Sequence, residues 1–330
     1  MQEGIPRAIL KDRRDKGKIA KNYAVIKAPE IFSLTDNPNG LIDFVNHCER
    51  ARNNRSKTGV AFDLRLVKEL DFSGIGVLIS LVYKLKLHKV KFNGINPTKR
   101  ELCLLLEHYN FFEQIGITPS YDNINFNVGK KGDKITIKGD KIVKPELGIE
   151  IANYISEKLF NDTLHTNDGF YRLFLELMAN TTTWSQQEND KNLWLLIMSY
   201  DKDERNINFQ FIDFGIGIFG SLRKSKKHSK WFGAISNLIT SDAQILQSML
   251  EGKSKVYKSS TGLYYRGKGI PTIKKGYDGN FYKNVEILTN KVYVNLDKDQ
   301  FITLDNNFNG TLIRFTVSAD NHFFKFVEQL

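Results

Sequence analysis

The sequence predicts two globular units in succession: an α/β unit of alternating strands and helices, then an α+β unit with a largely antiparallel sheet. The chain has 330 residues, of which 41% are hydrophobic, enough to form two cores. Strand and helix signals alternate between residues 23 and 117. From residue 146 onward, two helices come first and a run of strands follows, which is the order typical of α+β domains.

In the first unit, short apolar strands are predicted at residues 23–26, 60–66 and 89–95. A helix is predicted at residues 41–52 because apolar residues recur there at the spacing of one helical face. The turn at residues 71–73 leads into an apolar helix that continues to residue 87. Another helix is expected to start at Asn96-Pro97, because proline is favoured in the first helical turn, and to end near residue 109.

Apolar residues become scarce after the first unit, so residues 118–145 are predicted to be a linker with one hairpin, around residues 135–137. The second unit, residues 146–330, should open with helices at 147–160 and 169–180. A capping box at Ser241 predicts a further helix that ends at Gly252. The remaining elements are strands at residues 193–200, 207–212, 285–288, 292–296, 301–304 and 310–317, and a last helix near 321–329.

The longest apolar stretch, residues 75–83, is about half the length that a membrane-spanning helix needs. The basic start of the chain has no apolar core of the kind found in secretory signals, so a cytoplasmic protein without membrane partners is expected. Cys48 and Cys103 lie in predicted helices without metal-ligand spacing. Neither a disulfide nor a zinc site is therefore expected.

The net charge of +11 is concentrated in two segments. Residues 219–275 carry twelve Lys and Arg against two acidic residues, and a basic tail at residues 1–22 carries seven against three. The rest of the chain has a slight negative charge. Each segment is either a solvated flexible stretch or an element that binds anions, such as nucleotide phosphates or a nucleic-acid backbone.

Two short patterns place polar groups where they can do chemistry. Glu176 and Asn180 are four residues apart on an amphipathic helix, so their side chains project together. Asp213 ends an apolar strand and is followed by Gly215 and Gly217. Glycines allow the backbone to approach a ligand closely, and an aspartate at the end of a strand can accept a hydrogen bond from an exocyclic amine.

Two further patterns lie nearer the C-terminus. Residues 261–270 are rich in glycine and cationic side chains, and they lead into a helical segment, which is the composition of a phosphate cradle. Asn309-Gly310-Thr311 enters the last strand.

The order and spacing of these four motifs resemble the GHKL ATPase superfamily, whose members share the Bergerat fold, an α/β sandwich. The resemblance implies a site for ATP and Mg²⁺, with Glu176 as general base and Asn180 as a ligand of Mg²⁺. It also implies that Asp213 binds the adenine amine, that Thr311 supports the adenine pocket and that residues 218–265 form a lid. The residues placed near the base and phosphates are Gly215, Gly217, Gly262, Arg266, Gly267, Lys268 and Gly269.

Residues 23–117 resemble the STAS domain of anti-sigma factor antagonists, through the Asp71-Phe-Ser-Gly turn and the apolar helix after it. In that family, a GHKL kinase phosphorylates the serine at this place, which is Ser73 here. Serine is also a preferred N-cap residue, whose hydroxyl satisfies a backbone N–H at the start of a helix. Ser73 is therefore either a helix cap or a phosphoacceptor.

Together the two resemblances imply a cytoplasmic bacterial signalling protein, in which ATP binding closes a basic lid and changes how a STAS-like domain contacts a protein partner or a second copy. Slow ATP hydrolysis is the leading expectation. A second hypothesis is a protein-serine kinase that acts on Ser73 or on the corresponding serine of a partner. A third is a nucleic-acid-associated ATP clamp, in which the 1–22 tail and the lid contact the nucleic-acid backbone. A fourth is a sensor that binds nucleotide without hydrolysing it.

Overall fold

The computed structural model describes residues 23–54, 56–109, 111–112, 134–139, 145–160, 168–184, 194–224, 241–252 and 269–321. The protein has an α/β structure, and the chain divides into two compact units, Met1–Asp122 and Asn123–Leu330. Within the part of the chain that is described, no helix has the length and apolar character needed to cross a membrane. The last predicted helix and the basic tail at residues 1–22 lie outside the described residues.

The first unit contains a parallel sheet in the order β1 (Tyr23–Lys27), β3 (Gly59–Asp63) and β5 (Lys91–Ile95). The connecting helices are α2 (Pro38–Arg52) and α3 (Phe72–Leu87), and α4 (Arg100–His108) follows β5. β2 (Ile31–Phe32) and β4 (Glu69–Leu70) form a separate, parallel two-stranded sheet. The three predicted strands and three predicted helices are confirmed, with shifts at their ends.

One of these shifts has a clear cause. The predicted strand at residues 60–66 stops at Asp63, because the Asp63 carboxylate binds the residue two positions later. Its Oδ1 accepts from the Arg65 backbone N–H (3.2 Å) and Nε (2.8 Å), and its Oδ2 accepts from Nη2 (2.6 Å). These bonds lower the pKa of Asp63 and turn the chain away from the sheet.

The second unit contains a five-stranded antiparallel sheet in the order β6–β7–β8–β10–β9. Its strands are β6 (Lys134–Gly139), β7 (Trp194–Asp201), β8 (Asn206–Asp213), β9 (Lys283–Asn295) and β10 (Gln300–Ser318). The prediction places residues 135–137 in a linker hairpin; these residues lie in β6, which pairs with β7 along its whole length. Ile135 and Ile137 are buried in the core of this unit, and the partner strand is far away in the sequence.

The four strands predicted between residues 285 and 317 are two long strands. Asn290 has a φ of 50°, which bends β9 without ending it. β10 compensates with register shifts between Thr303 and Phe308 and between Phe308 and Thr311. These irregularities interrupt the apolar alternation in the sequence, so each long strand has the pattern of two short ones.

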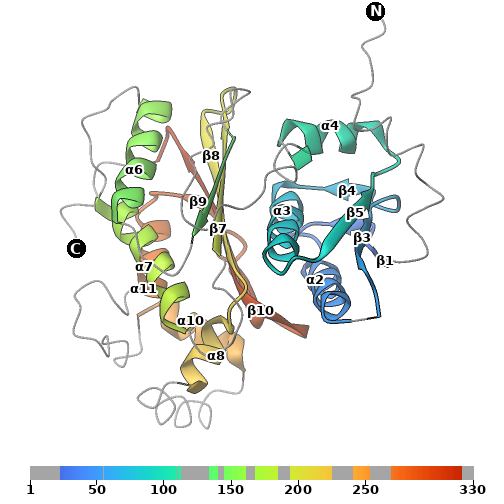
Figure 1. Ribbon diagram of the computed structural model, residues 1–330. Helices are drawn as coiled ribbons and strands as arrows, with labels where there is room; N and C mark the ends of the chain where they lie inside the picture. Colours follow the sequence, from blue (N-terminus) through green and yellow to red (C-terminus); the bar gives the residue numbers. More distant parts are fainter. Residues whose placement is uncertain are drawn as a thin grey trace, which may run out of the picture. The chain divides into compact units, whose positions relative to one another are not determined.

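Helices α6 (Pro145–Phe160), α7 (Asp168–Trp184) and α11 (Gly269–Asp278) cover one face of this sheet (Figure 1). Phe209 and Phe315, on neighbouring strands, stack at 4.9 Å between centroids, and Phe174 of α7 connects the helix layer to them, 5.8 Å from Phe209. Helices α8 (Gly217–Lys224) and α10 (Asp242–Leu250) add side chains to the same core. As predicted, Ser241 caps α10, and Gly252 follows it with a φ of 66°.

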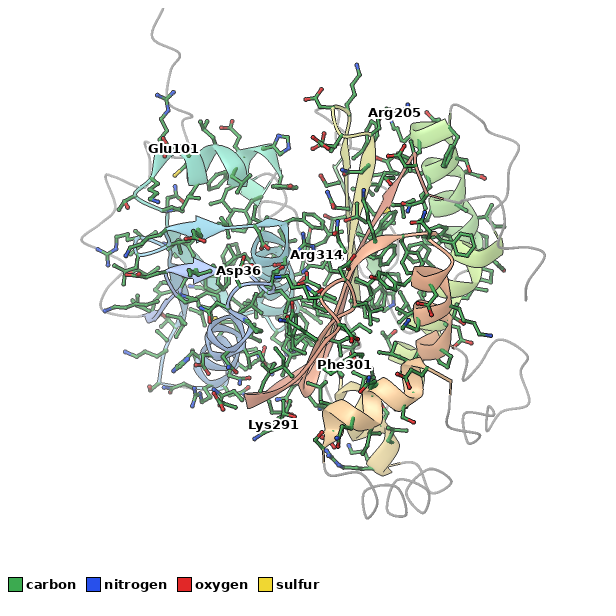
Figure 2. All side chains as sticks on the ribbon, turned by 180° about the vertical axis from the view of Figure 1, so that it is seen from behind. Asp36, Glu101, Arg205, Lys291, Phe301 and Arg314 are labelled. Carbon is green, nitrogen blue, oxygen red and sulfur yellow. The ribbon has the colours of Figure 1, made fainter. Side chains whose placement is uncertain are left out.

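On β9 and β10, polar side chains alternate with those of the core. Arg314 on β10 (Figure 2) pairs with Glu286, with 2.9 Å between Nη1 and Oε2. The Tyr293 hydroxyl donates to Oε1 of the same carboxylate at 2.5 Å, and Asn295 Nδ2 donates to it at 3.4 Å. Burial and the Glu286 charge both raise the pKa of Tyr293. The buried carboxylate is thus neutralised and hydrogen-bonded within the sheet itself.

Tyr282 provides a test of this core. Its hydroxyl donates to the Ile273 carbonyl at 2.8 Å, and burial raises its pKa above the ordinary value of 10.0. A raised pKa favours the neutral phenol in the folded state, so its contribution is fully present below about pH 10 and is lost as the pH rises further. Above pH 10, we expect the free energy of unfolding of Tyr282→Phe to fall less steeply with pH than that of the wild type. The two slopes should differ by up to about 1.4 kcal/mol per pH unit, the value for one proton.

Denaturant unfolding at a series of pH values between about 9 and 11.5 measures this slope. Equal slopes for Tyr282→Phe and the wild type would show that the pKa of the Tyr282 hydroxyl is the same in the folded and the unfolded protein.

Candidate functional site

The residues predicted to contact adenine meet at one end of the second sheet. β8 ends at Asp213, and the antiparallel register places Thr311 of β10 directly opposite it. Thr311 is in turn opposite Thr289 of β9. Three polar side chains on adjacent strands therefore lie at the same level, although they are distant in the sequence.

Gly310 allows this arrangement. Its φ is +142°, a region that other residues rarely adopt, and a Cβ there would lie 2.0 Å from the Asp213 carbonyl oxygen. The backbone of β10 therefore contacts the end of β8 directly, and there is no room for a side chain at position 310. Both its φ and its contact with Asp213 therefore require glycine at position 310.

The turn after β8 is stabilised by Asp213 itself. Its Oδ1 accepts from the Gly215 N–H at 2.8 Å. Aspartate side chains commonly form such a bond with the backbone two residues later, and it stabilises a turn. Gly217, with a φ of +73°, then begins α8. We refer to residues 213–217 as the glycine turn. The half-buried Asp213 carboxylate is held in one orientation by this turn.

Two residues that the sequence did not single out secure the other side of the glycine turn. Thr289 Oγ1 accepts from the Ile218 N–H at 3.0 Å, and Asn290 Oδ1 accepts from the Phe219 N–H at 3.0 Å. The only signal that could have indicated them is a Thr-Asn pair directly after an apolar run, within a longer strand pattern.

Helix α7 runs toward this end of the sheet. Phe170, in its first turn, contacts Tyr282 just before β9 begins, with 5.8 Å between ring centroids. Phe174, one turn later, contacts Phe209, which is nearer to Asp213 along β8. The later turns of α7 therefore lie toward the end that carries Asp213.

Glu176 and Asn180 are on these later turns. Glu176 is 3% exposed, so this carboxylate is buried on a helix whose neighbouring side chains are mostly apolar. The side chain of Asn180, the predicted Mg²⁺ ligand, lies outside the described residues. Among the residues that are described, no group of three or more His, Cys, Asp and Glu is arranged to hold a metal ion.

Two helices of the predicted lid contribute side chains to the core of the unit, and the lid itself stays a prediction. Within residues 218–265, α8 buries Phe219 and α10 buries Leu246 and Met249, all at 0% exposure, in the main core of the unit. The intervening stretches lie outside the described residues, as do the predicted phosphate contacts Gly262, Arg266, Gly267 and Lys268. Gly269 is the first residue of α11.

Ser73 is not the cap of α3, which corrects one of the two predicted roles. Asp71 is the N-cap residue, and its Oδ1 accepts from the Gly74 N–H at 2.9 Å. Ser73 is 0% exposed; its hydroxyl accepts from the Leu34 N–H at 2.9 Å and donates to Asp71 at 2.5 Å. The hydroxyl therefore connects α3 to the segment after β2, and a kinase could reach it only after these bonds open.

No protein-family model matches this chain, and no curated protein matches it either. A function therefore has to be inferred from the chemistry of Asp213, Thr311 and Glu176 and from the backbone geometry around them.

Replacing Ser73 by Ala tests its structural role. The change leaves the buried Leu34 N–H without its acceptor, which costs about 1 to 3 kcal/mol. Ser80→Ala is the matched control, because Ser80 is equally buried but donates to the Gly76 carbonyl within its own helix. Denaturant unfolding should show a clearly larger loss for Ser73→Ala. Similar losses in the two variants would mean that the contact with Leu34 adds nothing.

Proposed function

We propose that the second unit binds ATP with Mg²⁺ at the end of β8, beside Thr311 of β10, and hydrolyses it slowly. The observation that carries the proposal is the pairing of Asp213 with Thr311 beside a backbone approach that requires Gly310. These residues occupy the adenine positions of the GHKL motifs that the sequence resembles.

The chemistry of the pair suits adenine. A carboxylate accepts a hydrogen bond from the exocyclic amine of adenine, whereas guanine would present a carbonyl oxygen to the same acceptor. The Thr311 hydroxyl can donate or accept beside it. A site with fixed polar groups discriminates strongly against a base that leaves them without partners. Asp213 and Thr311 thus favour adenine over guanine.

Glu176 is the proposed general base. Its carboxylate is buried on the part of α7 that lies toward Asp213, where water access is limited. Asn180, one turn further along the helix, is the proposed ligand of Mg²⁺. Mg²⁺ held by Asn180 would supply positive charge beside the phosphates, and Glu176 would accept a proton from the attacking water.

Hydrolysis is favoured over transfer of phosphate to Ser73, because that hydroxyl is buried and already makes two hydrogen bonds. The first unit is then proposed to act as the interaction domain for a protein partner or a second copy. Incubation with γ-labelled ATP and Mg²⁺, followed by separation of labelled protein from released phosphate, distinguishes hydrolysis, phosphotransfer and simple binding. Addition of duplex DNA to the same assay tests the hypothesis of a nucleic-acid-associated clamp.

Asp213→Asn should weaken ATP binding by about 10- to 100-fold, the value of a hydrogen bond to a charged group. The amide oxygen can still accept from Gly215, so the turn is retained, while an amide N–H₂ replaces the acceptor that faces adenine. Asp203→Asn, in the exposed turn after β7, is the control with the same change of charge. Calorimetry with Mg²⁺-ATP measures both. Wild-type affinity in Asp213→Asn would exclude Asp213 from the site.

Glu176→Gln should retain nucleotide binding but lose turnover by about 10²- to 10⁴-fold, because it removes the base at nearly constant volume. Glu157→Ala, on the exposed side of α6, should keep the wild-type rate. Phosphate release and ATP affinity are measured on the same samples. If Glu176→Gln hydrolysed ATP as fast as the wild type, the activity would have another source.

A further inference from the structure

The first amides of α8 are occupied by side chains from β9. The Ile218 N–H donates to Thr289 and the Phe219 N–H donates to Asn290, each at 3.0 Å. The N-terminus of a helix otherwise offers such N–H groups to an anion. Here they bind protein groups, so this helix end serves to hold the glycine turn and not to bind phosphate.

Asn290 holds the turn from both sides. Besides accepting from Phe219, its Nδ2 donates to the Ile216 carbonyl at 3.0 Å. A Cβ on Gly217 would lie 2.4 Å from Asn290 Oδ1, so the amide fits closely over a residue that has no side chain. A carboxamide supplies the donor and the acceptor together, which a carboxylate of the same shape cannot do.

Thr289 connects the turn to β10. Its Oγ1 accepts from Ile218, donates to the Gly310 carbonyl at 3.1 Å and lies 3.4 Å from Thr311 Oγ1. The Thr289 side chain is 0% exposed. One buried hydroxyl thus links the segment that follows Asp213 to the strand that carries Thr311.

From this geometry we infer that Thr289 and Asn290 are positioning residues that set the distance between the Asp213 carboxylate and the Thr311 hydroxyl, and so determine selectivity for adenine. This inference rests on the proposed function. Asn290 acts through the glycine turn, whereas Thr289 acts through the start of α8 and the Gly310 carbonyl. Without them Asp213 can shift relative to Thr311, and the discrimination between adenine and guanine falls together with the affinity for ATP.

Three variants of the full chain test the inference. Thr289→Val removes the hydroxyl at constant shape, and Thr289→Ser restores it. Asn290→Asp keeps the acceptor for Phe219 but removes the donor to Ile216. The matched control is Thr316→Val, which removes another buried hydroxyl of this sheet; this hydroxyl donates to Asn208 at 2.8 Å, near the C-terminal end of β10.

Calorimetry measures the affinities for Mg²⁺-ATP and Mg²⁺-GTP, and thermal melting confirms folding. We expect Thr289→Val and Asn290→Asp to weaken ATP binding by about 10-fold and to reduce the ATP-to-GTP affinity ratio. Thr289→Ser should restore the ratio, and Thr316→Val should lower the melting temperature while leaving the ratio unchanged.

Two results would contradict the inference, and they differ from each other. If the wild type binds ATP and the ratio is the same in Thr289→Val, Asn290→Asp and the wild type, the two residues only stabilise the fold and the proposed function stands. If the wild type does not bind ATP, the proposed function and this inference both fail.

Discussion

The close approach between the backbones of Gly310 and Asp213 is the constraint on which the rest of the second unit depends. Because residue 310 has no Cβ, β10 can lie directly against the end of β8. The last strand of the sheet in sequence thereby takes a place between β8 and β9. This inner place sets the register that aligns Asp213, Thr311 and Thr289. A larger residue at 310 would push β10 away from the end of β8 and separate these groups.

The irregular backbone of β9 and β10 has a function in this arrangement. Asn290 adopts a positive φ in the middle of β9, and β10 accommodates extra residues opposite it. A regular strand would project its side chains alternately to the two faces of the sheet. The bend instead lets two consecutive residues, Thr289 and Asn290, both reach the amides of α8. The distortion of the sheet is what connects it to the helix.

The first unit uses the same physical device with different residues. At Gly74, a Cβ would lie 2.2 Å from the Phe32 carbonyl oxygen, so the first turn of α3 comes directly against the end of β2. Ser73 and Asp71 then satisfy the polar groups that this approach buries: Ser73 accepts from Leu34, and Asp71 accepts from Ser33 at 3.0 Å. In both units, a glycine permits the approach and a neighbouring hydroxyl supplies the hydrogen bond. Such contacts are stable only when every buried polar group has a partner.

The sequence by itself determined the features that depend on neighbours along the chain. Continuous apolar runs located α3, β7 and β8, and the capping box at Ser241 located α10, because these signals are complete within one short segment. The Asp213 and Gly310-Thr311 motifs were also visible, as residue types at a strand end.

Only the tertiary structure decided what depends on distant partners. The pairing of β6 with β7, the continuity of β9 and β10, and the roles of Thr289 and Asn290 all involve residues that meet only after folding. The same reason separates Asp71 from Ser73. From the sequence, only Ser73 is expected as the cap, but the Leu34 N–H from another segment binds the serine hydroxyl and the cap is Asp71. A hydrogen bond between distant segments leaves no periodic trace in either of them, so pattern alone could not predict it.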